Sequence, residues 1–235
     1  MTPQRPLTLQ GIPVPYDSDL DELRWLIEDD GAARAAAFVA LGHRPDDAAL
    51  EALADYARRS DAALRRGALD VIATHPRGSL LSQVVIERLS DPHEGVAAAA
   101  CAAAGSLQLA DAHARVLELV ASDSQLVRHA AVHALRRLWQ ERDFETVLGV
   151  FRGERDDATL NEAAWVLRET ASPRTWSRLF DAWVRDSHPR HREWACELAK
   201  RFGGPEDLSE LRRLLADRDA HVRAAAMTAV RHFGG

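Results

Sequence analysis

The sequence predicts an all-α fold, a right-handed α-α solenoid of stacked helical pairs. Three observations lead to this prediction: a motif that recurs about every 31 residues, an alanine at the same place in every copy, and a composition rich in small apolar residues. Hydrophobic residues make up 46% of the 235 residues, whereas aromatic residues make up only 6%. Small side chains allow close packing of helix against helix. A repeat of this length is typical of stacked two-helix units.

The recurring motif has a reference position that occurs seven times. The reference residues are Ala33, Leu64, Val96, Val127, Leu160, His191 and Val222. The residue four places later is alanine in every copy: Ala37, Ala68, Ala100, Ala131, Ala164, Ala195 and Ala226. The residue seven places later is also apolar in every copy. Apolar residues at i, i+4 and i+7 share one helical face, so each copy is predicted to contain an amphipathic helix whose alanine face is buried.

Polar residues before each reference position predict where these helices begin. The candidate N-caps are Asp61, Asp91, Asp123, Asp156, Ser187 and Asp219, whose side chains can accept hydrogen bonds from first-turn amides. Gly42, Gly105 and Gly203 are predicted to end helices in a left-handed backbone conformation. A second apolar segment, such as residues 144–151 or 208–215, separates each of these helices from the next. Each unit is therefore a helical pair, which gives fourteen helices.

The clearest copies, at residues 123–135 and 219–230, resemble the HEAT-repeat family in its short bacterial form. That family joins a leucine-rich helix through an aspartate turn to a helix that reads Val-Arg-x-x-Ala-Ala-x-x-Leu. Its arginine position is filled here by Arg34, Arg65, Arg128, Arg192 and Arg223. The resemblance implies a structural ladder of these arginines with turn aspartates. Ala97 and Asn161 replace the arginine, and His191 replaces the valine, so those units depart from the pattern.

The pattern covers residues 18–235, which we predict to be one domain of about seven HEAT-like pairs. Residues 1–17 form a predicted leader that contains four prolines and no apolar signal-peptide core. No stretch approaches the roughly 18 apolar residues of a membrane span, so a soluble, cytoplasmic, bacterial protein is expected. The last helix has no polar capping helix after it, and self-association through this helix is a further expectation.

The charge balance argues against nucleic acid as the partner. The net charge is −6 and the isoelectric point is about 5.9, whereas phosphate binding requires several convergent basic residues. No phosphate loop, nucleophile elbow or zinc spacing occurs, and no cofactor or metal is expected. The expected partner is a protein or peptide, with no role for a membrane.

The resemblance implies that the second helix of each pair lines the concave surface. On those helices, positions two, six and nine after the reference lie opposite the apolar stripe. These positions hold Arg66 and Asp70 in the second unit but only small or apolar residues in the first and third. In units four to six they include His129, His133, Arg136, Glu162, Val166, Glu169, Glu193 and Glu197. Trp165, at position five, lies beside this stripe, where packing between units and partial exposure are both open.

We predict that a partner binds units four to six, where mixed charge lies beside aromatic residues. The predicted contact residues are His129, His133, Arg136, Glu162, Trp165, Glu169, Glu193 and Glu197.

Three catalytic alternatives stay open beside a non-catalytic scaffold. The two histidines with Glu162 and Glu193 are similar to the metal site of HEAT-like deoxyhypusine hydroxylase, but Ala130 stands where that family needs a glutamate. Residues 165–169 resemble a segment of the HEAT-like alkylpurine DNA glycosylases, whose acidic catalytic segment has no counterpart here. Phycobilin lyases share short HEAT-like units. The scaffold is favoured because the fold mainly supports binding.

Overall fold

The computed structural model describes residues 8–9, 11–29, 31–154, 156–170 and 172–234. These residues form fourteen α-helices, as the sequence predicts, with several short 3-10 turns and one small hairpin. The chain divides into two compact units, Met1–Trp139 and Gln140–Gly235, and each unit is described here by itself. The single domain predicted for residues 18–235 therefore stays a prediction.

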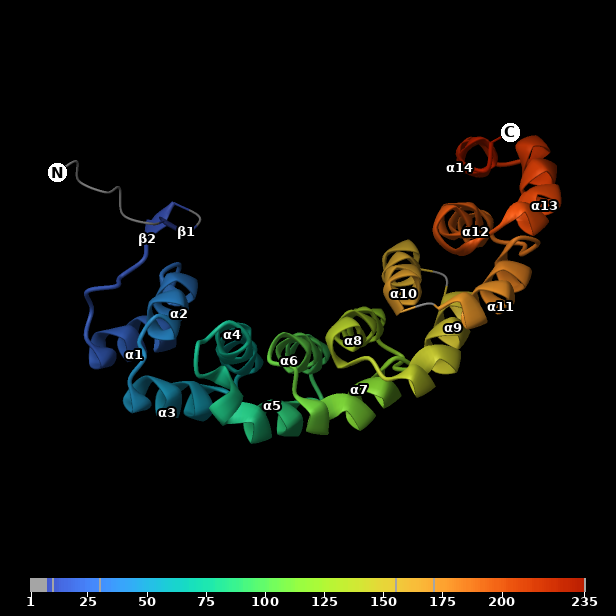
Figure 1. The fold of residues 1–235 in the computed structure, drawn as a ribbon. Coiled ribbons are helices and arrows are strands. Elements are labelled where there is room, and N and C mark those ends of the chain that lie inside the picture. The colour runs from blue at the N-terminus through green and yellow to red at the C-terminus, as the bar shows by residue number, and fades with distance from the viewer. Residues whose placement is uncertain (1–7, 10, 30, 155, 171, 235) are drawn as a thin grey trace. The chain divides into compact units, whose positions relative to one another are not determined.

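The first unit contains four helical pairs arranged in two layers (Figure 1). Its pairs are α1 (Leu20–Glu28) with α2 (Arg34–Gly42), α3 (Asp47–Tyr56) with α4 (Ala62–Ile72), α5 (Ser82–Arg88) with α6 (Glu94–Ser106), and α7 (His113–Leu119) with α8 (Gln125–Leu138). The second helices α2, α4, α6 and α8 lie side by side, and we call them the second-helix layer of this unit. The closest packing within this layer is between α6 and α8.

A hairpin that the sequence did not predict precedes these helices. Strand β1 (Thr8–Leu9) pairs antiparallel with β2 (Ile12–Pro13), and the turn between them contains Gly11 at φ 85°. Glycine adopts this left-handed conformation without the steric cost that a Cβ would bring. Strand β1 contacts α2, and Val14, which follows the hairpin, is buried.

The second unit contains three helical pairs. They are α9 (Phe144–Gly153) with α10 (Asp157–Thr170), α11 (Pro173–Trp183) with α12 (Pro189–Phe202), and α13 (Leu208–Arg213) with α14 (Ala220–His232). Helices α10, α12 and α14 form the second-helix layer of this unit, and α12 packs closely with α14.

The alanine column is the constant part of the core in both units. All seven alanines at position four after the reference are fully buried, at 0% exposure. The position-seven residues are also buried, from Ala40 in α2 to Ala229 in α14. The inward-facing stripe predicted from the spacing is therefore confirmed.

The prediction that three glycines end helices is confirmed in part. Helix α2 ends at Gly42 and Gly203 is the C-cap of α12, whereas Gly105 lies inside α6, and none of the three is left-handed. A Cβ at Gly42 would lie 2.6 Å from Cγ1 of Val71, and one at Gly105 would lie 2.8 Å from Cα of Ala134. These two glycines are required for the close approach of neighbouring helices rather than for chain reversal.

Half of the predicted N-caps are confirmed. The carboxylates of Asp61, Asp156 and Asp219 accept hydrogen bonds from first-turn amides of α4, α10 and α14. The predictions for α6, α8 and α12 are wrong, because these helices begin after His93, Ser124 and His188. Asp91 lies two residues before the N-cap His93, and its carboxylate accepts hydrogen bonds from the His93 amide and from an arginine of the preceding pair.

Buried arginines link successive pairs in both units. Arg65 of α4 donates from Nε and Nη2 to Asp91, both at 2.9 Å, and Arg192 of α12 binds Asp217 in the same way at 2.7 and 2.8 Å. The Nη1 group of each arginine also donates to the carbonyls five and six residues earlier. Arg128 and Arg223 make the same two carbonyl contacts. These bidentate pairs are the structural ladder that the family resemblance implies.

Candidate functional site

The eight predicted contact residues are all at least partly exposed, but they are divided between the two units. His129, His133 and Arg136 lie on α8 of the first unit. Glu162, Trp165 and Glu169 lie on α10, and Glu193 and Glu197 lie on α12, all in the second unit. We therefore consider the α8 group and the α10–α12 group as two separate surfaces.

Trp165 is the principal feature of the α10–α12 surface. Its side chain is 42% exposed, although five of the six other residues at this position of the repeat are buried. The guanidinium of Arg168 lies 4.5 Å from the Trp165 ring centroid, within the range of a cation–π contact. The ring of Trp194 from α12 meets Trp165 edge to face at 6.2 Å. A large, partly exposed ring is thus held in place from two sides.

The neighbouring helix supports this arrangement through a side-chain hydrogen bond. The indole Nε1 of Trp194 donates to Oδ1 of Asn161 at 3.1 Å. Asn161 stands where the HEAT pattern has arginine, so this departure from the pattern links α10 to α12.

The acidic residues of α12 are partly neutralised by their own helix. Arg190 donates to Glu193 at 2.7 Å, and Lys200 lies 2.6 Å from Glu197. Both pairs have the i, i+3 spacing of neighbours on a helix surface. The surface therefore presents alternating charge rather than one sign.

The open face of α10 differs from the prediction. Val166, predicted to face outward, is fully buried, whereas Trp165 and Glu169 are exposed. The exposed stripe of α10 therefore includes positions two, five and nine of the repeat instead of positions two, six and nine. Position two of α6, Ala98, and position nine, Gly105, are also buried.

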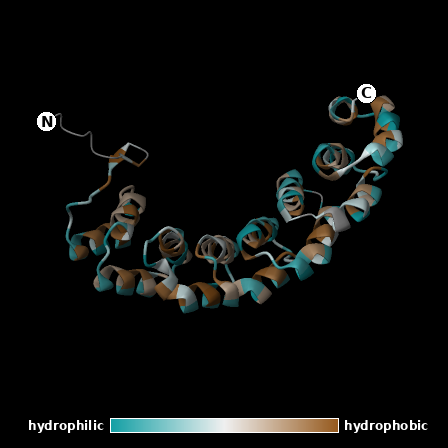
Figure 2. Cartoon of the chain, viewed as in Figure 1, coloured by the Kyte–Doolittle hydropathy of each residue, from teal (hydrophilic) through white to brown (hydrophobic). Residues whose placement is uncertain are grey.

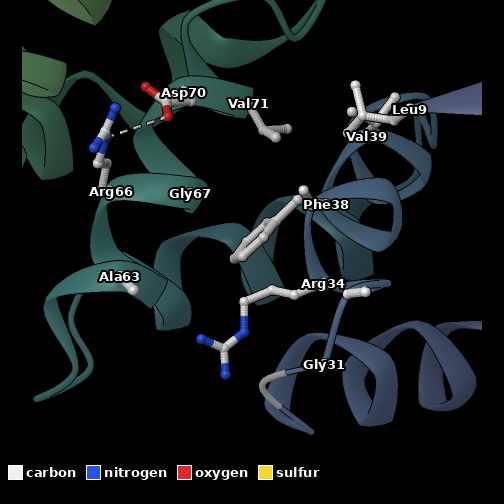
Figure 3. Close-up of a pocket in the computed structure, with 12 residues that line it drawn as sticks. Leu9, Gly31, Arg34, Phe38, Val39, Ala63, Arg66, Gly67, Asp70 and Val71 are labelled. Carbon is white, nitrogen blue, oxygen red and sulfur yellow. Dashed lines mark ion pairs between the residues drawn. The ribbon is translucent and has the colours of Figure 1, made fainter. Parts of the chain in front are cut away.

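A groove between α2 and α4 was not predicted as a site. It contains a cavity of about 450 Å³ lined by Leu9, Gly31, Ala32, Arg34, Ala35, Phe38, Val39, Ala63, Arg66, Gly67, Asp70 and Val71. Figure 3 shows Phe38 reaching from α2 toward α4 at Gly67. A second cavity of about 450 Å³ continues along the same helices to His43 and Thr74.

Small residues at exposed positions create this groove. Ala35 and Ala63 are exposed, and a Cβ at Gly67 would lie 2.7 Å from the Phe38 ring. The sequence showed that the first helical pair offers only small or apolar residues on this face. That observation was a signal for a groove, because small side chains leave space that larger ones fill.

The groove has an ion pair on its α4 wall. Nε of Arg66 lies 3.8 Å from Oδ2 of Asp70, and both side chains are about 60% exposed. Partial burial raises the pKa of the Asp70 carboxyl, and the charge of Arg66 opposes this effect. Sequence reasoning placed both residues on the correct face but did not predict a cavity there.

The chemistry of the described residues gives no direct sign of catalysis. No group of three or more histidine, cysteine, aspartate or glutamate side chains among them is arranged to hold a metal ion. Burial raises the pKa of the Cys101 and Cys196 thiols to about 12, which disfavours the nucleophilic thiolate. Within the described part of the chain, each helix is too short or too polar to cross a membrane.

The paired helices, the alanine column and the arginine ladder define an α-α solenoid protein. A model of HEAT repeats matches residues 82–168 and 145–231. These spans together cover more than half of the chain, so the chain belongs to the HEAT-repeat family.

Solved structures agree with this fold. YibA of Escherichia coli is 18% identical with a TM-score of 0.63, over 92% of this chain and 83% of that chain. An engineered protein is also 18% identical, with a TM-score of 0.54 over 80% of this chain and 98% of that chain. At such identities the likeness concerns the fold alone. A search of curated protein sequences finds no match.

Proposed function

We propose that the chain is a non-catalytic scaffold that binds a protein or peptide through its second-helix layers. The observation that carries this proposal is Trp165, which is 42% exposed and held between Arg168 and Trp194. Tryptophan and arginine are enriched among the residues that dominate binding energy at protein interfaces. A ring that is already fixed loses little conformational entropy when a partner binds.

The charges around this ring favour protein recognition over phosphate binding. Arg168 contacts the ring, while Arg190 and Lys200 are paired with glutamates of their own helix. A phosphate backbone requires several basic residues directed at it. Mixed charge around an aromatic centre is the composition of a protein interface.

The α8 residues form the first unit's part of the proposal. His129, His133 and Arg136 extend from a helix whose other face is buried through Val127, Ala131 and Leu135. We propose that these three side chains also contact the partner. Their contribution is testable separately, because each unit carries its own residues. The cytoplasmic location remains an expectation.

The test compares two exposed tryptophans. The purified chain is immobilised, proteins are captured from cells that produce it, and each captured protein is identified by mass spectrometry. Trp165→Ala is expected to lose the specific partner, because it removes the central aromatic contact. Trp25→Ala is the matched control, since Trp25 is 64% exposed but lies on α1.

A charge-reversal pair gives the second comparison. Glu193→Arg with Glu197→Arg changes α12, whereas Glu145→Arg with Asp181→Arg changes α9 and α11, the first helices of their pairs. We expect only the α12 variant to weaken partner binding, measured by calorimetry with the purified partner. Loss of binding in the α9–α11 variant alone would locate the interface on the other layer and contradict the proposal.

A further inference from the structure

The arginine ladder is interrupted between the third and fourth helical pairs of the first unit. We call one arginine with its aspartate a rung, such as Arg65 with Asp91. The arginine of a rung follows one reference position by one residue, and the aspartate precedes the next reference position by five. In the third and fourth pairs these two positions are filled by Ala97 and Ser122. Both charged groups of this rung are therefore missing.

A cavity lies at the place of the missing rung. Its lining includes Ala97 and Ser122, and also Asp91 and Pro92, which come six and five residues before Ala97. In the complete rungs, the backbone carbonyls at these two places accept hydrogen bonds from the arginine Nη1. All four positions that form a rung therefore meet in one cavity.

The cavity is large enough for a guanidinium group. Its volume is about 200 Å³, which exceeds the roughly 150 Å³ of an apolar cavity that binds benzene, and a guanidinium group is smaller than benzene. Ala97, Leu119 and Val127 pack together at one wall. A guanidinium is weakly hydrated for a cation, so its flat face can lie against such a wall while its edges donate hydrogen bonds.

The polar wall offers acceptors for those edges. The Ser122 hydroxyl accepts a hydrogen bond from the Ser124 amide at 3.3 Å, which leaves its second lone pair. The Glu94 carboxylate lines the cavity and accepts a hydrogen bond from the Ser124 hydroxyl at 2.6 Å. Within the described part of the chain, Glu94 forms no ion pair. It can therefore supply the negative charge that an aspartate supplies in a complete rung.

The other charged groups of the lining already have partners. Arg115 lies 2.7 Å from Glu118, and Asp91 is bound by Arg65 and Arg88. The two complete rungs show how this kind of site divides its hydrogen bonds, since Nη1 donates to two carbonyls while Nε and Nη2 donate to a carboxylate. Only a planar group with several N–H donors matches that arrangement, and an ammonium does not.

We propose that this cavity, between the turns that precede α6 and α8, binds a guanidinium group reversibly in place of the missing rung. The group donates to the carbonyls of Asp91 and Pro92, to the Ser122 hydroxyl and to the Glu94 carboxylate. It belongs either to a free guanidino compound or to an arginine side chain of another protein, and the recognition chemistry is the same for both. The site uses none of the residues that we assign to partner binding, so the inference is independent of the proposed function.

The experiment titrates the full chain, labelled with ¹⁵N, with millimolar methylguanidinium and follows backbone amide resonances. Methylammonium is the control for charge, and N-methylurea is the control for shape. We expect saturable shifts in residues 91–97 and 122–127, with both controls bound at least about tenfold more weakly. Equal binding of methylammonium, or a lack of saturable shifts in these segments, would overturn the proposal.

The variant Ala97→Arg supplies the guanidinium from within the chain. It should unfold at an equal or higher urea concentration than the parent, and it should bind methylguanidinium at least about tenfold more weakly because the site is filled. Ala102→Arg is the control, since Ala102 is exposed on α6 and lies outside the cavity. It should leave probe binding unchanged. A lower unfolding midpoint in Ala97→Arg alone would show that the cavity does not accept this group.

The variant Glu94→Gln tests the counter-charge without filling the cavity. Glutamine can still accept the hydrogen bond from Ser124, but probe binding should weaken about fivefold. Glu51→Gln on α3 should leave binding unchanged. Unaltered binding in Glu94→Gln would contradict the assigned set of acceptors.

Two further ligands distinguish the sources of the group. Agmatine represents free guanidino compounds, and acetyl-Gly-Arg-Gly-amide represents an arginine side chain of a protein. Tighter binding of agmatine would assign the site to a free compound, and tighter binding of the peptide would assign it to a partner's arginine. If neither ligand displaced methylguanidinium, the site would not serve a guanidinium ligand and the proposal would be wrong.

Discussion

Helices α6 and α10 occupy the same place in the repeat but have very different surroundings. In α6, ten of 13 residues are buried, and its residues at positions five and nine are Cys101 and Gly105. In α10, six of 14 residues are buried, and the same positions hold Trp165 and Glu169. Figure 2 shows hydrophilic stretches on α10 and scarcely any on α6. The shared core positions maintain the fold, and the others decide whether a helix is buried by neighbours or offers a surface.

The ladder arginines are common to both units. Their removal should therefore cause the largest loss of stability among these predictions, and the loss should be equal in the two units. Arg65→Met and Arg192→Met each leave a buried aspartate without its bidentate partner. The expected cost is about 3–5 kcal/mol in the free energy of unfolding. Urea unfolding followed by circular dichroism measures it, with hydrogen exchange to locate the loss.

The control for this prediction is Arg223→Met, since Arg223 is exposed and its guanidinium donates to the backbone carbonyls of Asp217 and Arg218. It should cost less than about 1 kcal/mol. A large effect in one unit and none in the other would mean that the ladder is not a common element of the two units.

The close approach of α6 and α8 gives the second prediction. Gly105→Ala puts a Cβ 2.8 Å from Cα of Ala134, and backbone cannot move aside as a side chain can. We expect a loss of about 1–3 kcal/mol in unfolding free energy, measured by urea denaturation.

The matched glycine lies in the second unit. Gly149 is inside α9, and a Cβ there would meet nothing within 4 Å. Gly149→Ala should therefore stabilise the protein by about 0.5–1 kcal/mol through helix propensity alone. Stabilisation by Gly105→Ala as well would show that α6 and α8 do not depend on glycine for their spacing.

The role of Gly105 illustrates what the sequence could and could not predict. The alanine column is a local pattern with a fixed period, so the helices and their inward faces followed from spacing, whereas the ladder was implied by the resemblance to the HEAT family. Gly105 was predicted as a helix stop. The sequence could not show its actual role, because its contact residue, Ala134, is 29 residues away and only the fold brings the two together. The left-handed residue after α6 is instead Gln108, at φ 53°.

The candidate site shows the same limit. Spacing placed the eight predicted residues on accessible faces, but it left open whether Trp165 is exposed, because exposure depends on neighbours from other helices such as Trp194 of the next pair. The α2–α4 groove depends on small side chains from two helices, Ala35 of α2 and Ala63 of α4. A periodic pattern reports which residues are apolar and does not report how far apart two helices settle.

The third prediction concerns the stability of the protein in acid, where an ion pair of the second unit should have a smaller effect. Hydrogen bonds from Arg185 and then Arg213 lower the pKa of Glu210 in the second unit from 4.5 to about 2. Because the folded pKa lies below the unfolded one, the contact stabilises the fold above about pH 4.5 and is lost as the pH falls toward 2. The pair is partly exposed, so about 1 kcal/mol is expected.

This prediction is measured by urea unfolding between pH 2 and 6. Glu210→Gln should lower stability at pH 6 and flatten the dependence below pH 4.5. Glu118→Gln in α7, whose partner Arg115 is on the same helix, is the control and should leave the acid dependence unchanged. An unaltered curve in Glu210→Gln would rule out this pair as a source of acid sensitivity.

The smallest predicted effect concerns the contact that holds Trp165. Arg168→Gln removes the guanidinium at 4.5 Å from the ring centroid but keeps a long polar side chain, and an exposed cation–π contact contributes about 0.5–1 kcal/mol. The measurement is ¹⁹F NMR of the chain labelled with 5-fluorotryptophan. The resonance that disappears in Trp165→Phe is assigned to Trp165, and Arg168→Gln should shift this resonance. The Trp194 signal should also change, because its ring meets Trp165 edge to face, while Trp183, fully buried in α11, should not. An unshifted Trp165 resonance would mean that Arg168 does not hold this ring in place. The surfaces of α10 and α6 would then differ only in how many of their residues are exposed.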